Sequence, residues 1–170
     1  MAGVLIYGPP KSGKTLLALY YASRAGRPLL LDLDLSPPLV AHGLPRIEGD
    51  QRRLLESLHR ALKLASALRL SSMVVDSLTG PLELLGPSEV AGVLRNLRTP
   101  LTLAVTSPVY LSAGLEPVKA SVDRASGELV AAGPGLMLRT PIQRLVSHLW
   151  EVLHHGSPRQ VEEQVEEAEA

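Results

Sequence analysis

A glycine-rich stretch near the start of the chain has the residue types and spacing of a phosphate-binding loop. Residues 8–15 read GPPKSGKT and match G-x-x-x-x-G-K-[ST] at every fixed position. In such a loop, backbone N–H groups and the dipole of the following helix surround an anion. The lysine, Lys14, reaches the β- and γ-phosphates, and the Thr15 hydroxyl ligates Mg²⁺. The predicted nucleoside triphosphate site consists of Gly8, Pro9, Pro10, Lys11, Ser12, Gly13, Lys14, Thr15 and Leu16.

An aspartate ends an apolar run about sixty residues after this loop. Residues 72–76 read SMVVD, which is typical of a buried strand. In proteins with a phosphate loop, a carboxylate at this edge of the sheet holds the magnesium ion. The pattern predicts that Asp76 and Thr15 hold Mg²⁺ together.

Two further aspartates end another apolar run. Residues 29–34 read LLLDLD, and side chains alternate along a strand, so Asp32 and Asp34 are expected on the same side near the nucleotide. Either carboxylate could orient or deprotonate an attacking water.

The hydrophobic pattern predicts the elements that position these residues. Short apolar runs predict buried strands at 4–7, 29–34, 72–76 and 101–106. Helical spacing predicts helices at 13–25, 50–68 and 88–97. Asp50 and Ser88 are the expected N-caps of the last two. Loops are predicted for 36–49 and 107–134. Alternating strands and helices predict an α/β fold with a mostly parallel central sheet flanked by helices.

The last part of the chain is expected to close the sheet. We predict a helix at 136–144 and a strand at 145–154. A turn then leads into an antiparallel edge strand at 159–165, which gives a C-terminal hairpin. The acidic end, 162–170, could be helical or frayed instead.

Composition limits the class of protein. A length of 170 residues predicts a single domain, and the zero formal net charge gives no bulk electrostatic argument for nucleic acid or a membrane surface. The absence of cysteine excludes disulfides and thiolate metal sites. No signal peptide and no apolar run of about 20 residues is visible, so we expect a cytoplasmic protein. A single asparagine and abundant proline suggest a thermophilic source.

Three segments resemble the RecA/RadA recombinase family. Residues 74–79, VVDSLT, resemble its Walker B segment. The run ending at Asp34 resembles the family's strand that ends in a water-activating glutamate, and residues 105–109, VTSPV, resemble its segment after the fourth strand. The resemblance implies a RecA-like ATPase core over residues 1–170 that binds ATP and Mg²⁺. It assigns catalysis to Lys14, Asp34 and Asp76.

Departures from the family narrow this expectation. Asp34 is one methylene shorter than the family's glutamate, and Pro108 replaces its γ-phosphate-sensing glutamine. The family's N-terminal domain and its phenylalanine-containing polymerisation segment are not found. The resemblance therefore implies a minimal paralog that hydrolyses ATP weakly and assists homologous recombination and DNA repair. Its expected partner is a recombinase or another paralog, and oligomers are compatible with this role.

DNA contact would fall to the loop 110–134, which matches the family's second DNA-binding loop. The candidate contacts to single- or double-stranded DNA are Lys119, Arg124, Arg139 and Arg144.

Other interpretations stay open. The order Gly8-Pro9-Pro10 also resembles the phosphate loop of AAA+ ATPases. A small P-loop kinase would use Arg139 and Arg144 in a lid. An ATP-dependent interaction module that does not bind DNA is the third alternative.

Overall fold

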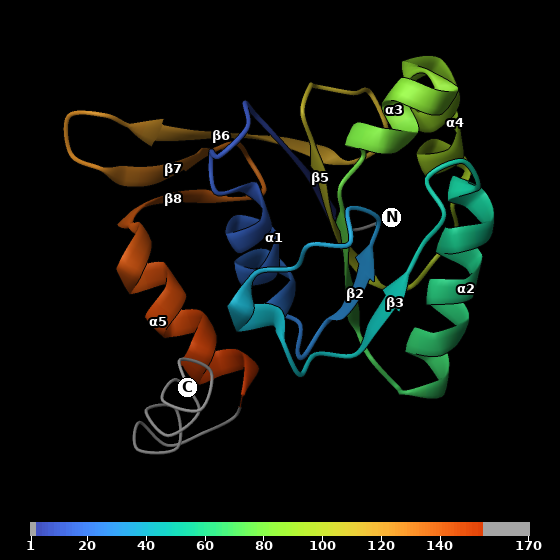
Figure 1. The fold of residues 1–170 in the computed structure, drawn as a ribbon, viewed down its shortest axis with the longest axis horizontal. Helices are drawn as coiled ribbons and strands as arrows, with labels where there is room; N and C mark the ends of the chain where they lie inside the picture. Colours follow the sequence, from blue (N-terminus) through green and yellow to red (C-terminus); the bar gives the residue numbers. More distant parts are fainter. Residues whose placement is uncertain (1–2, 155–170) are drawn as a thin grey trace.

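The computed structural model describes residues 3–154, so the hairpin strand expected at 159–165 lies outside them (Figure 1). Within these residues the chain forms one eight-stranded sheet in the order β3-β2-β4-β5-β1-β6-β7-β8. The strands from β3 to β6 run parallel, and β7 and β8 are antiparallel additions. The strands are β1 (Gly3–Tyr7), β2 (Leu29–Asp32), β3 (Arg46–Glu48), β4 (Ser72–Asp76), β5 (Thr102–Ser107), β6 (Glu116–Asp123), β7 (Glu128–Ala132) and β8 (Met137–Pro141).

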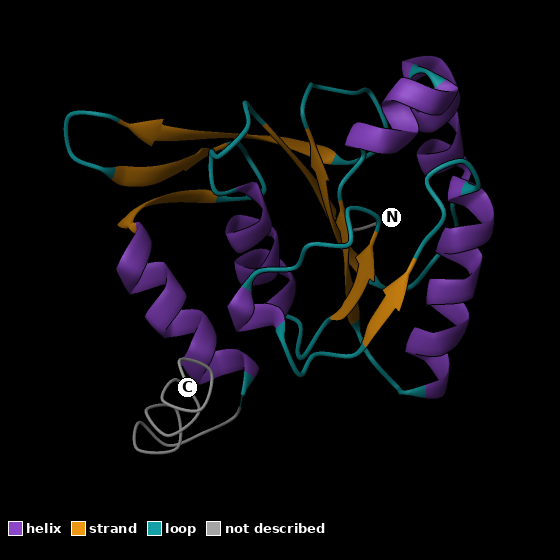
Figure 2. Ribbon diagram, viewed as in Figure 1, coloured by secondary structure: helices purple, strands orange, loops and turns teal. Residues whose placement is uncertain are grey.

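Helices cover both faces of this sheet, as Figure 2 shows. They are α1 (Lys14–Ser23), the 3₁₀ helix η1 (Leu39–Ala41), α2 (Leu54–Ala67), α3 (Thr79–Leu85), α4 (Pro87–Asn96) and α5 (Ile142–Leu153). The predicted α/β fold with a mostly parallel sheet is confirmed. Within residues 3–154, no helix is long and apolar enough to cross a membrane.

The apolar runs form strands because both faces of the sheet are buried. Along β1, Val4 and Ile6 enter the apolar cluster beneath α1 and α5, whereas Leu5 enters the cluster beneath α2 and α4. A strand buried on both sides is apolar at every position, so its sequence reads as a continuous run. The four strands expected from such runs are all present, each within two residues of its predicted bounds.

The stretch 36–49 is not only a loop, because it contains η1 and the three-residue edge strand β3. The expected caps are also wrong. Asp50 accepts a hydrogen bond from the Arg52 amide at 2.9 Å, but α2 begins at Leu54. Ser88 lies inside α4, which starts with Pro87 at its first position, where proline is favoured.

The prediction for the C-terminal third was wrong in three places. The expected loop 107–134 contains β6 and β7, which form an antiparallel hairpin. The expected helix 136–144 contains β8, and the expected strand 145–154 falls in α5. In α5 the buried leucines recur every four residues, at Leu145, Leu149 and Leu153, and this period belongs to a helix. The antiparallel part of the sheet is therefore β6–β7–β8.

Candidate functional site

The loop between β1 and α1 is held against the sheet by close backbone contacts. The Gly8 amide donates a hydrogen bond to the Ser107 carbonyl of β5 at 3.3 Å. A side chain at position 8 would collide with the carbonyl oxygen of Ala120 in β6. At Gly13, where φ is +78°, a Cβ would approach the Leu129 side chain within 2.6 Å. Both fixed glycines of the sequence pattern are therefore required by packing and backbone conformation.

Within the loop, one polar side chain is buried without a partner. The Ser12 side chain is 2% exposed, and its hydroxyl makes no hydrogen bond to any described residue. The preceding residue, Lys11, is exposed and adopts a left-handed backbone conformation with φ of 59°. A buried hydroxyl without a partner is costly, so the loop has an unsatisfied group that a ligand could satisfy.

The Lys14 side chain folds back onto the start of the loop. Its Nζ donates hydrogen bonds to the carbonyl oxygens of Gly8 at 2.7 Å and Pro9 at 2.9 Å. Burial lowers the pKa of the Lys14 ammonium, while the charges of Asp76 and Asp34 act in the opposite direction. The first α1 hydrogen bond joins the Leu17 amide to the Gly13 carbonyl, so the amides before it lack an intrahelical acceptor. The loop thus combines a partly buried cation with free N–H groups.

Asp76 ends β4 and accepts hydrogen bonds from two threonines. Thr15 Oγ1 donates to one carboxylate oxygen at 3.0 Å, and Thr106 Oγ1 donates to the other at 2.7 Å. Asp76 is 7% exposed, and burial raises its pKa. The two hydroxyl hydrogen bonds lower this pKa, whereas the charges of Asp34 and Asp32 raise it further. Thr106 was not predicted as a site residue, although its place at the end of an apolar run could have suggested it.

The two aspartates expected on one side near the nucleotide have different surroundings, since Asp32 is the last residue of β2 and Asp34 lies beyond it. Asp32 is 1% exposed and forms an ion pair with Arg46 at 2.7 Å. Its other oxygen accepts the amides of Asp34 and Leu35 at 3.1 and 2.7 Å. Asp34 lies two residues beyond the strand and is exposed, but its charge influences the pKa values of Lys14 and Asp76. Asp32 therefore stabilises the turn, and Asp34 lies near the loop.

The four candidate DNA contacts lie on four different elements. Lys119 is exposed on β6, Arg124 lies in the β6–β7 turn, and Arg144 is on α5. Arg139 on β8 forms an ion pair with Asp123 at 2.7 Å and approaches Glu128 at 3.5 Å. The hydrogen bond from Arg139 lowers the pKa of the Asp123 carboxyl. The Arg139 charge is thus already matched within the hairpin.

An apolar groove adjoins the loop at Leu16, the residue after Thr15. It has a volume of about 480 Å³ and lies between α1, η1 and α5. Its lining residues are Leu16, Pro38, Leu39, Val40, Val146, Ser147 and Trp150. The predicted site included Leu16 but none of the other walls, because these come from segments far apart in the sequence.

The donor set at Thr15 and Asp76 suits a hard cation, since it offers a hydroxyl and a carboxylate oxygen. Among residues 3–154, no group of three or more His, Cys, Asp or Glu side chains could hold a metal ion by itself. A magnesium ion here would take most of its ligands from phosphate and water, as is usual for nucleotide-bound Mg²⁺.

Neither the protein-family models nor the curated proteins compared with the chain match its sequence.

Proposed function

We propose that this protein binds a nucleoside triphosphate with Mg²⁺ in the loop 8–16 and hydrolyses it slowly. The observation that carries this proposal is the arrangement around α1. Lys14 lies inside a glycine-flanked loop, free amides follow it, and Thr15 contacts Asp76 at 3.0 Å. Together they provide the donors, the cation and the metal-ligand pair that triphosphate binding needs.

The loop contains groups that can exchange their present contacts for phosphate oxygens. The Lys14 ammonium donates hydrogen bonds to the carbonyls of Gly8 and Pro9. When a nucleotide binds, the ammonium would donate to oxygens of the β- and γ-phosphates in their place. The Ser12 hydroxyl, which has no partner among the described residues, would gain an acceptor. Both changes convert poorly satisfied protein groups into charge-assisted hydrogen bonds.

Thr15 and Asp76 would hold the magnesium ion on the side of the loop that faces β4. When bound, Mg²⁺ neutralises charge on the β- and γ-phosphates. Asp34 would orient the attacking water and accept its proton while the water oxygen attacks the γ-phosphorus and the bond to the bridging oxygen breaks. Because Asp34 is short, exposed and beyond the end of β2, we expect slow turnover.

The nucleoside would lie in the apolar groove beside Leu16. Its volume of about 480 Å³ falls within the range of small-ligand pockets, about 300–1,000 Å³. One of its walls is Leu16, which follows Thr15 in the first turn of α1, so we place the base and ribose there.

The role in recombination and DNA repair rests on the resemblance of residues 74–79 to the RecA/RadA family. In this proposal the chain is a RecA-like ATPase that works with a partner protein. A second candidate is an ATP-dependent interaction module that does not bind DNA. It is favoured by the pairing of Arg139 with Asp123 and Glu128, which leaves that arginine little charge to offer a phosphate backbone.

Calorimetric titration with a slowly hydrolysed ATP analogue tests the nucleotide-centred proposal. We expect saturable, Mg²⁺-dependent binding that weakens at least about tenfold in Lys14→Ala, since charge-assisted hydrogen bonds are worth about 1.5–3 kcal/mol each. Lys63→Ala changes an exposed lysine on α2 and serves as the matched control. Unchanged affinity in a folded Lys14→Ala variant would contradict the proposal. Titration with single-stranded DNA at two salt concentrations separates the two candidates.

A further inference from the structure

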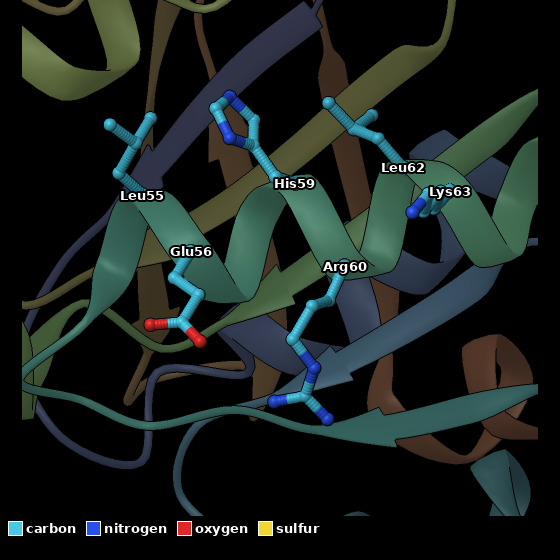
Figure 3. A pocket seen from close by; sticks show the side chains of 6 residues that line it. All are labelled: Leu55, Glu56, His59, Arg60, Leu62 and Lys63. Carbon is cyan, nitrogen blue, oxygen red and sulfur yellow. The ribbon is translucent and has the colours of Figure 1, made fainter.

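The outer face of α2 carries a row of two leucines and a histidine beside a row of one glutamate and two basic residues. Leu55, His59 and Leu62 point to one side of the helix, whereas Glu56 and Arg60 point to the other (Figure 3). These residues and Lys63 line a shallow hollow of about 700 Å³. Leu55 is 47% exposed. No described residue covers this face.

Positive charge exceeds negative charge in α2 and the residues that flank it. Residues 52–69 contain four arginines and one lysine but a single acidic residue, Glu56. Glu56 already pairs with Arg53 at 3.3 Å. Arg60 and Lys63 both flank the apolar row, and their side chains are exposed. A ligand for this surface should therefore be acidic and amphipathic.

The chain itself contains a segment with the complementary pattern. Residues 159–170 contain five glutamates and a single arginine. Because the whole chain has zero net charge, residues 1–158 carry a net positive charge that balances this acidic segment. Val161, Val165 and Ala168 have the spacing i, i+4, i+7, as do Leu55, His59 and Leu62. Each residue of the segment's row is followed directly by a glutamate, at Glu162, Glu166 and Glu169. In α2 the residues that follow the row Leu55, His59 and Leu62 are likewise charged, namely Glu56, Arg60 and Lys63.

The described chain ends on the face of the sheet opposite to α2, which favours a contact with a second copy. The described chain ends after α5, which packs with α1 on one face of the sheet, while α2 packs on the other face (Figure 1). Residue 161 follows His154 by seven residues, which span at most about 25 Å. A path around the sheet edge would have to pass two helices of about 10 Å diameter and the sheet between them.

We propose that residues 161–169 of one copy dock on the outer face of α2 of a second copy. The apolar rows would pack together, and Glu162 and Glu166 would meet Arg60 and Lys63. The contact joins two different surfaces, so it can add further copies in a head-to-tail manner. A nine-residue segment buries little area, so the contact is weak and depends on concentration and salt. It does not depend on the proposed nucleotide site.

Sedimentation velocity of the full chain tests this contact. Association should rise with protein concentration at low salt and disappear at high salt. Arg60→Glu with Lys63→Glu should weaken it about tenfold or more, since reversing two ion pairs changes two weak attractions into repulsions. Glu162→Lys with Glu166→Lys should do the same. A mixture of these two doubly substituted chains should associate. The basic segment of the second variant can meet the acidic α2 of the first, and the unchanged segment of the first can meet the unchanged α2 of the second.

Two controls carry the same charge change elsewhere. Arg124→Glu with Arg144→Glu alters exposed cations away from α2, and Glu163→Lys with Glu167→Lys alters glutamates away from the apolar row. Both should associate more tightly than the corresponding test variants. Thermal melting confirms that each variant is folded.

A chain that stays monomeric at high concentration and low salt would overturn the proposal. So would unchanged association of the Arg60→Glu, Lys63→Glu variant, or failure of the mixed variants to associate. If the Arg60→Glu, Lys63→Glu variant instead loses binding to a single-stranded oligonucleotide while its self-association is unchanged, α2 is a nucleic-acid surface and the proposal is wrong.

Discussion

The hydroxyl of Thr15 donates a 3.0 Å hydrogen bond to the carboxylate of Asp76 across 61 residues of sequence. This bond joins the first turn of α1 to the end of β4. It places two oxygen donors at one side of the loop, where a magnesium ion would sit between protein and phosphates. Thr106 holds the other carboxylate oxygen at 2.7 Å, so the orientation of Asp76 is fixed from both sides.

The first prediction concerns metal dependence. Asp76→Asn keeps the shape of the side chain but removes its charge, so we expect nucleotide affinity to lose most of its dependence on Mg²⁺. Titrations with and without Mg²⁺ measure this directly. Asp123→Asn is the control, because that carboxylate lies in the β6–β7–β8 hairpin. If Mg²⁺ strengthened binding equally in Asp76→Asn and in the native chain, Asp76 would not be a metal ligand.

The second prediction concerns the pH dependence of stability. Burial raises the pKa of Asp76, so between its usual pKa of 3.8 and its raised pKa the folded state binds more protons than the unfolded state. The stability contributed by the protonated form is therefore lost as pH rises through that interval. We expect the free energy of unfolding of Asp76→Asn, relative to native, to increase from pH 4 to pH 7 in metal-free buffer. Urea unfolding at both pH values measures it, and a constant difference would contradict the assigned cause.

The third prediction separates Asp32, which ends β2, from Asp34, which lies beyond it. Asp32→Ala leaves the Asp34 and Leu35 amides without their acceptor and leaves Arg46 paired with Glu48 alone, and this should cost about 1–3 kcal/mol of stability. Asp34→Ala changes an exposed side chain and should alter stability by no more than about 0.5 kcal/mol, while it lowers the rate of ATP hydrolysis. Urea unfolding and a phosphate-release assay measure the two effects. Similar stability losses in both variants would show that the roles are not divided in this way.

The sequence predicted the central part of the fold because burial on both sheet faces leaves a readable pattern. Val4, Leu5 and Ile6 are apolar in succession, and the phosphate-loop motif follows them directly. The β6–β7 hairpin was missed because its buried positions include small residues such as Ala120 and Ala131, which give a weak period-2 signal.

Within the site, the motif residues could be predicted but their partners could not. Alternation along a strand placed Asp32 and Asp34 on one side, yet β2 ends at Asp32 and the alternation rule does not extend beyond it. The role of Asp32 depends on Arg46, which belongs to a three-residue strand too short to show a pattern. The groove walls come from η1 and α5, and only the tertiary fold brings them to Leu16.

The fourth prediction concerns the choice of base. The groove beside Leu16 is lined mostly by apolar side chains, with Ser147 as its one hydroxyl. Apolar pockets discriminate between similar ligands by only about 10–200-fold, whereas pockets that hydrogen-bond a ligand can reach about 10⁴-fold. We therefore expect ATP and GTP affinities within about two orders of magnitude of each other, measured by competition against a fluorescent nucleotide.

A substitution that fills the groove tests the same prediction from the other direction. Ser147→Trp should weaken ATP binding about tenfold or more and leave inorganic tripolyphosphate binding unchanged, because only the nucleoside would lie against α5. Ser126→Trp, in the exposed β6–β7 turn, is the matched control. Equal weakening of ATP and tripolyphosphate would mean that the substitution disturbs the phosphate loop. Unchanged ATP binding would mean that the base lies elsewhere. A strong preference for one base would contradict the prediction of weak discrimination.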